Sequence, residues 1–211
     1  MTKGSLIINQ VAWNVGTLAQ RLVAGYYTQM AAIHVAADPR ATALAPPIEP
    51  GQAVSVLRVP RDDGTYHTFH FSHFLAEIGK PQLVEDFKRA WLANSLLMIG
   101  DRLGEAGYYK QTPNAQPEAE LVRHLRNGIA HGNRFSFHSR DVDKRSGHLK
   151  RPAHNRRYTT ALTMREYAVD THLRQTKVLF DYGGPAAILD ILTALGWHLT
   201  RTACGFAVGT A

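Results

Sequence analysis

A short polar segment near residue 130 carries residue types suited to chemistry at a phosphate. Arg126 and Asn127 are followed, after three further residues, by His131. An imidazole takes up or releases a proton near neutral pH, and a guanidinium presents a fixed positive fork to a phosphate. A carboxamide donates and accepts hydrogen bonds without titrating. These three residues are therefore our candidate catalytic set.

The candidate set lies at the end of an expected helix. Glu118 and Glu120 suit the positive start of that helix, and Gly132 is a natural stop. The apolar stripe of the helix is formed by Leu121, Leu125 and Ile129. At about 100° per residue, Asn127 and His131 lie on the side away from this stripe. We therefore expect them to face either water or a partner.

The segment Arg126-Asn127-x3-His131 resembles the signature of the HEPN superfamily, in which four to six residues separate an arginine from a histidine. The resemblance implies an all-α, four-helix up-and-down bundle with the motif near the end of the third helix. It also implies a metal-independent endoribonuclease, in which a ribose 2′-hydroxyl attacks the adjacent phosphate. In that reaction His131 is the general acid or base, Arg126 stabilises the phosphorane, and Asn127 orients the phosphate or His131.

The resemblance has further implications for partners. It implies a homodimer through the Arg126–His131 face, no cofactor, and a role as a toxin or antiphage effector with an antitoxin or regulatory protein as partner. In some toxin members a tyrosine two residues after the histidine is modified, whereas this chain has Asn133 there. The alternative is a catalytically inactive HEPN-like module that binds nucleic acid or protein.

Positive charge is concentrated in one stretch of the chain. Lys and Arg number 24 against 17 Asp and Glu, and residues 134–157 alone hold eight basic residues and two acidic ones. Such an excess favours an anionic partner. The residues expected to contact RNA are Arg134, Arg140, Lys144, Arg145, Lys150 and Arg151. The stretch is either an ordered hairpin or a mobile charged loop, and Phe135, Phe137 and Tyr158 either stack on bases or anchor the core.

The remaining elements complete an expected single domain over residues 1–211. An apolar stripe from Val11 to Ile33 predicts a first helix, and Asp-Gly turn chemistry predicts a β-hairpin insertion at about residues 53–71. A second helix follows Pro81, with its expected face at Leu83, Phe87, Trp91 and Met98. Residues 158–163 and 177–182 are expected to be short and extended, and a last helix follows Gly184.

Composition excludes several classes of protein. One cysteine, Cys204, rules out a disulfide framework and a cysteine-rich zinc site. The sequence lacks a long apolar run, so we expect no membrane span, and the polar N-terminal segment leads us to expect a cytoplasmic protein. The histidines at 67, 70 and 73 are interpreted as surface residues, and no metal site is expected.

Overall fold

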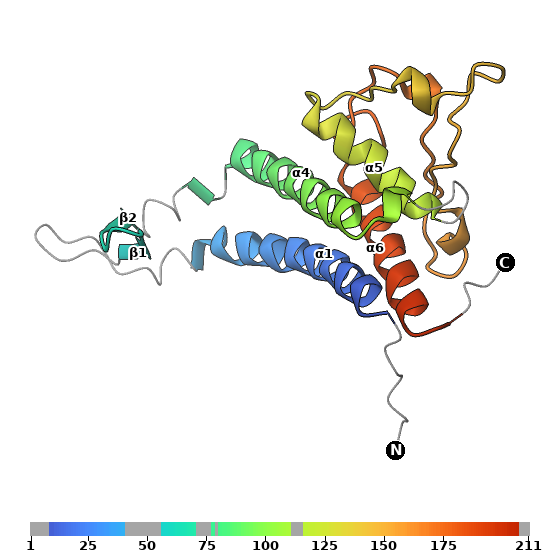
Figure 1. The fold of residues 1–211 in the computed structure, drawn as a ribbon. Helices are drawn as coiled ribbons and strands as arrows, with labels where there is room; N and C mark the ends of the chain where they lie inside the picture. Colours follow the sequence, from blue (N-terminus) through green and yellow to red (C-terminus); the bar gives the residue numbers. More distant parts are fainter. Residues whose placement is uncertain (1–8, 41–55, 71–76, 79, 111–115, 207–211) are drawn as a thin grey trace, which may run out of the picture. The chain divides into compact units, whose positions relative to one another are not determined.

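The computed structural model describes residues 9–40, 56–70, 77–78, 80–110 and 116–206 (Figure 1). This part of the chain is mostly helical with one small antiparallel sheet, which confirms the expected all-α character with a β-hairpin. Its long helices are α1 (Gln10–Ala36), α4 (Pro81–Glu105), α5 (Pro117–Ala130) and α6 (Gly184–Ala203). Its strands are β1 (Val56–Pro60) and β2 (Tyr66–His70).

The chain divides into two compact units. One contains Met1–Ala24 with Arg89–Ala211, and the other contains Gly25–Lys88. The second unit carries the hairpin, in which β1 pairs with β2. Gly64 takes a φ of +80° in the connecting turn, and the Asp63 carboxylate accepts a hydrogen bond from the Thr65 amide at 2.9 Å. The predicted hairpin and its Asp-Gly turn are therefore confirmed.

In the first unit, α6 is buried on most of its sides. Its large buried residues are Ile188, Ile191, Leu192, Leu195 and Leu199. Removing that much apolar surface from water is the main favourable contribution to folding of this unit. Helix α5 packs against α6, and the core therefore lies directly beneath the helix that carries the candidate motif.

Glycines allow two close helix approaches in the first unit. A Cβ on Gly16 of α1 would lie 3.0 Å from the Gly196 carbonyl oxygen of α6, so only glycine lets the two backbones come this near. Similarly, a Cβ on Gly100 of α4 would lie 2.4 Å from Cγ of Arg126 on α5. The Trp91 indole of α4 donates a hydrogen bond to the Leu22 carbonyl of α1 at 3.1 Å.

Two predicted helix faces are partly wrong. In α4, Leu83 and Met98 are exposed, and the buried face is Leu92, Leu96, Ile99 and Leu103. Residues 96–99 are all apolar, so periodicity alone could not choose among them. In α1, Val11 is exposed, and small residues such as Ala12 and Ala19 are buried instead.

The two expected extended segments are also wrong. Residues 158–163 contain the end of the 3₁₀-helix η3 (Arg156–Tyr158), followed by turns. In 177–182 only Lys177 makes a bridge, to Arg134, and its amide also donates to the Asp181 carboxylate at 3.0 Å. Local side-chain acceptors of this kind favour turns over a continuing strand.

Candidate active site

The end of α5 fixes the position of His131. This residue caps the helix, and its amide donates to the Asn127 carbonyl at 3.0 Å. Gly132 follows with a φ of +83°, which reverses the chain as the sequence predicts. Asn133 then accepts a hydrogen bond from the Leu179 amide through its side chain at 2.9 Å. The turn after the helix is thereby anchored on both sides.

The His131 imidazole is exposed at this helix end. Across the described residues its ring makes no hydrogen bond, ion pair or ring contact. A histidine without an internal partner keeps both ring nitrogens available to a ligand or to a second protein chain. The expectation that His131 faces away from the core of its own helix is confirmed.

The Arg126 side chain lies against α4 rather than in open solvent. Its guanidinium donates to the Asp101 carboxylate through Nε at 3.0 Å and through Nη2 at 2.7 Å. The Arg126 and Asp101 side chains are 32% and 55% exposed, so this ion pair remains accessible to water. Gly100 provides the room that the Arg126 side chain needs beside α4.

Asn127 and Arg126 share one surface depression. Nη1 of Arg126 lies 3.5 Å from Oδ1 of Asn127, and both residues line a depression of about 500 Å³ together with Asp101, Tyr109 and Arg123. His131 does not line this depression. One helical turn, about 6 Å along the axis, separates it from Asn127. A single chain therefore joins Arg126 with Asn127 and holds His131 apart from them.

The basic stretch 134–157 contains an ordered hairpin at about residues 140–151, which matches one of the two alternatives that the sequence left open. The ends of the stretch pair elsewhere, Arg134 with Lys177 and His154 with Ala168. Val142 pairs with Leu149, and the Asp143 amide donates to the His148 carbonyl at 2.8 Å. A turn closes the hairpin at residues 143–147, where the Asp143 carboxylate accepts two backbone N–H groups. Its charges therefore have definite positions.

The expected RNA-contacting residues fall into different surroundings. Lys144 and Arg145 are exposed at the tip of the hairpin. Arg140 and Lys150 are exposed and line a second depression, and the Lys150 ammonium donates to the Arg140 carbonyl at 2.8 Å. The Arg134 side chain, also exposed, donates to the Gln175 carbonyl at 2.8 Å. For all of these residues, contact with RNA stays a prediction.

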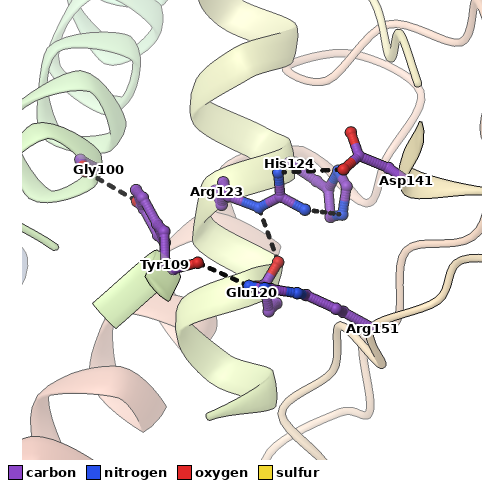
Figure 2. Close-up of polar contacts among 7 residues, drawn as sticks. All are labelled: Gly100, Tyr109, Glu120, Arg123, His124, Asp141 and Arg151. Atoms are coloured by element: carbon purple, nitrogen blue, oxygen red, sulfur yellow. Dashed lines mark hydrogen bonds and ion pairs between the residues drawn. The ribbon is translucent and has the colours of Figure 1, made fainter. Parts of the chain in front are cut away.

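Arg151 differs from its neighbours because it is half-buried in a network around Glu120, shown in Figure 2. The Glu120 side chain is 5% exposed and accepts hydrogen bonds from Arg151 at 2.9 Å and from Nε of Arg123 at 2.7 Å. Arg151 also donates to the Tyr109 carbonyl at 2.7 Å, and the Tyr109 hydroxyl donates to the Gly100 carbonyl at 2.8 Å. This network ties the hairpin to α5 and α4.

Sequence reasoning missed this network. Glu120 and Arg123 are three residues apart on a helix, a spacing at which side chains meet, so their pairing had a local signal. Arg151 follows Glu120 by 31 residues and had none. The sequence predicts that Glu120 lies near the start of the helix, and the structure confirms this position. Its side chain, however, is buried.

His124 completes the inner side of the network. Burial, with a smaller contribution from the Arg123 charge, lowers the pKa of His124 to about 4, so its imidazole is neutral at pH 7. Nη2 of Arg123 lies 3.4 Å from Nε2 of His124. Because a guanidinium can only donate, Nε2 accepts and the ring proton sits on Nδ1. Arg123 is thereby held by two neighbours on α5.

The aromatic residues of the basic stretch are core anchors. Phe135, Phe137 and Tyr158 are buried, and the rings of Phe135 and Phe137 stack with centroids 6.1 Å apart. Tyr158 bonds to the buried His198 at 2.8 Å. Of the two roles that the sequence left open, stacking on bases is therefore excluded for these three side chains in this conformation.

Within the described residues, no group of three or more His, Cys, Asp and Glu is placed to hold a metal ion. None of the described helices combines the length and apolar character that crossing a membrane requires.

Comparison with models of known protein families finds no match to this chain. Comparisons with curated proteins and with solved structures likewise find no match.

Proposed function

We propose that this chain is a HEPN-type endoribonuclease that cleaves single-stranded RNA without a metal ion. The observation that carries the proposal is the segment Arg126-Asn127-x3-His131 at the end of α5, with its histidine exposed and without an internal partner among the described residues. The arginine and the carboxamide lie together in one depression beside it. These are the groups that stabilise a phosphorane, orient a phosphate and transfer a proton.

In the proposed reaction, the ribose 2′-hydroxyl attacks the adjacent phosphorus as its proton passes to an imidazole. The bond from phosphorus to the 5′ oxygen breaks, and that oxygen takes a proton from a second acid. The products are a cyclic phosphate and a 5′-hydroxyl. Arg126 would neutralise the charge that develops on the phosphorane oxygens.

The reaction needs one base and one acid, whereas the motif of one chain offers a single histidine. A two-fold dimer through the Arg126–His131 face would supply His131 from each copy and would bring the second imidazole toward the depression of the first. The exposed position of His131 at the helix end suits such an interface. The dimer is therefore part of the proposal.

A binding module without catalysis is the second candidate function. It is favoured by the ion pair between Arg126 and Asp101, because a paired arginine has a structural role even without substrate. Under the catalytic proposal, an incoming phosphate displaces the Asp101 carboxylate. That exchange is feasible because both side chains remain accessible to water.

Under the catalytic proposal the protein acts in the cytoplasm as a toxin or antiphage effector, and an antitoxin or other regulatory protein restrains it. The strong positive charge agrees with RNA as the substrate but also suits other polyanions. A cleavage assay therefore tests the proposal more directly than a binding assay.

The experiment incubates the purified protein with single-stranded RNA in EDTA and measures cleavage and product ends. We expect cleavage that survives chelation and falls roughly 100-fold or more in His131→Ala, because that variant lacks the proton-transfer group. His138→Ala is the matched control, since His138 is also exposed and lies outside the motif. It should cleave like the wild type.

Four results would contradict this proposal. Full inhibition by EDTA would indicate metal-dependent chemistry, and equal activity of the two histidine variants would remove His131 from the reaction. RNA binding without cleavage across the pH range would favour the binding module. Sedimentation at micromolar concentration tests the dimer, because a strict monomer leaves the reaction without its second histidine.

A further inference from the structure

A second depression of about 500 Å³ lies between α5 and the basic hairpin. The hairpin contributes Arg140, Lys150 and Arg151 to its lining, and α5 contributes Arg123. Bonds between the two sides of the hairpin hold the first two in place, since the Lys150 amide donates to the Asp141 carbonyl at 2.9 Å. Four cationic side chains thus meet around one concave surface.

The charges around this depression do not cancel. Among the described residues, Glu120 bonds to Arg123 and Arg151, and Asp141 lies 3.8 Å from Arg123. The Asp143 carboxylate in the hairpin turn also interacts with the Lys150 charge. Against four cations these three carboxylates leave an excess of one positive charge. The nearby His124 adds no charge at pH 7, because its lowered pKa keeps it neutral. An anion with one negative charge would complete the balance.

The excess charge is also available for binding. Arg123 and Arg151 are held by Glu120, whereas the Arg140 guanidinium makes no hydrogen bond or ion pair to any described residue. Lys150 directs one N–H to the Arg140 carbonyl at 2.8 Å, and an ammonium has three donors. Arg140 and Lys150 therefore present unused donors at the exposed edge of the depression.

This second depression adjoins the one that contains Arg126 and Asn127. Tyr109 and Arg123 line both of them, so the Arg123 guanidinium stands on the wall that they share. Its bonds to Glu120 and His124, drawn in Figure 2, keep it in place. A chain of phosphates could therefore pass from one depression to the other along Arg123.

We infer that the depression edged by Arg140 and Lys150 binds one phosphodiester group of single-stranded RNA, next to the phosphate that meets Arg126. This inference rests on the proposed function, to which it adds a second substrate-binding position. It separates the basic residues by role: Arg140 and Lys150 bind, Arg123 and Arg151 form the wall, and Lys144 and Arg145 lie outside at the tip. The substrate must then span at least two phosphates.

The test compares two pairs of substitutions on the same hairpin. Arg140→Gln with Lys150→Gln removes the two binding cations, and Lys144→Gln with Arg145→Gln removes an equal charge from the tip. All four side chains are exposed, so both variants should fold, as circular dichroism can check. Binding of a fluorescent 12-nucleotide single-stranded RNA is measured by anisotropy over a range of salt concentrations. DNA of the same sequence and inorganic phosphate serve as competitors.

We expect the dissociation constant of the Arg140/Lys150 variant to rise roughly tenfold or more. The slope of log affinity against log salt should fall by about 0.7 for each phosphate that the variant no longer neutralises. The tip variant should change much less, although its net charge is the same. Equal losses of affinity in both variants would overturn the inference, because they would show that only total charge matters. An Arg140/Lys150 variant that keeps its RNA affinity would also overturn it, and inorganic phosphate that binds the wild type without displacing RNA would then assign the site to a small anion.

The inference and the proposed function fail separately. If the wild type does not cleave RNA but the Arg140/Lys150 variant still loses affinity selectively, the phosphate site is supported and the catalytic proposal is contradicted. If the wild type cleaves RNA and this variant keeps both its RNA affinity and its KM, the catalytic proposal is supported and the phosphate site is contradicted. DNA that competes as well as RNA would show that this site reads phosphate alone, as the inference requires.

Discussion

The first and second halves of α5 use the same residue types in opposite ways. In the first half, Arg123 and His124 are packed around the buried carboxylate of Glu120. In the second half, Arg126 forms an ion pair at the surface, and His131, which caps the helix, is exposed without an internal partner in the described part of the chain. Arginine and histidine on one helix thus serve either to hold the structure or to meet a ligand. Burial, rather than residue type, separates the two roles.

The largest effect that we expect is on the free energy of unfolding and concerns the buried first half of α5. Glu120→Ala leaves Arg123 and Arg151 without their shared carboxylate, and breaking such a buried pairing costs about 4 kcal/mol of unfolding free energy. Chemical denaturation measures the loss. Glu105→Ala is the control, because its pairing with Arg102 at 2.8 Å is solvent-exposed and should contribute little. If both variants lose the same stability, the Glu120 network is no stronger than a surface pair.

The next effect concerns His124, the buried histidine of α5, and depends on pH. The pKa of His124 is lowered to about 4 by burial, so between pH 6.5 and 4 the unfolded chain binds a proton that the folded chain does not. The free energy of unfolding should therefore fall as the pH falls through this window, on the order of 3 kcal/mol for this histidine. The contribution is constant above pH 6.5, where both states are neutral.

His124→Phe should make this acid-induced loss shallower, because it removes the group that takes up the proton while keeping a ring near Phe137. Every other titrating group is shared with the wild type, including Glu118, whose pKa is raised by burial and whose pH effect has the opposite sign. His131→Phe is the matched change on the exposed half. Denaturation at pH 7, 6 and 5 measures all three proteins, and identical pH profiles would contradict the assignment.

The smallest effect tests how Arg126 is seated against α4. Gly100→Ala places a Cβ 2.4 Å from Cγ of Arg126, so the helices must shift, at a cost of about 2 kcal/mol. Gly104→Ala, one turn along the same helix, meets only Tyr109 at 3.4 Å. It should raise stability by up to about 1 kcal/mol, because alanine favours a helix more than glycine does. Thermal unfolding measures the difference, and two equal shifts would show that Arg126 adjusts freely.

Much of the fold follows from local patterns in the sequence. The bounds of α5, the turn at Gly64 and the exposure of His131 depend on periodicity, turn chemistry and capping, all of which act within a few residues. The faces of α1 and α4 followed only in part. In α1 the stripe residues Val15, Tyr26 and Ile33 are buried as predicted, whereas the buried Ala12 and Ala19 give too weak an apolar signal to be recognised. In α4 the apolar run at 96–99 carries no period.

The candidate site was predictable only in part, because its remaining contacts are distant in sequence. Asp101 precedes Arg126 by 25 residues, and Arg151 follows Glu120 by 31. A charge-rich stretch gives no sign of which cations are paired inside the protein and which are exposed. Arg151 and Lys150 are neighbours in sequence, yet one is bound to Glu120 and the other lines the edge of the depression.

The close contact between α1 and α6 has a consequence for folding during synthesis. Gly16 and Gly196 meet backbone to backbone although 180 residues separate them. A ribosome adds roughly 5 to 20 residues per second, so α1 waits on the order of 10 to 40 seconds for its partner. During that delay the α1 surface that α6 will cover, including Ala19, stays open to other chains. The first unit therefore cannot finish folding until α6 has emerged from the ribosome.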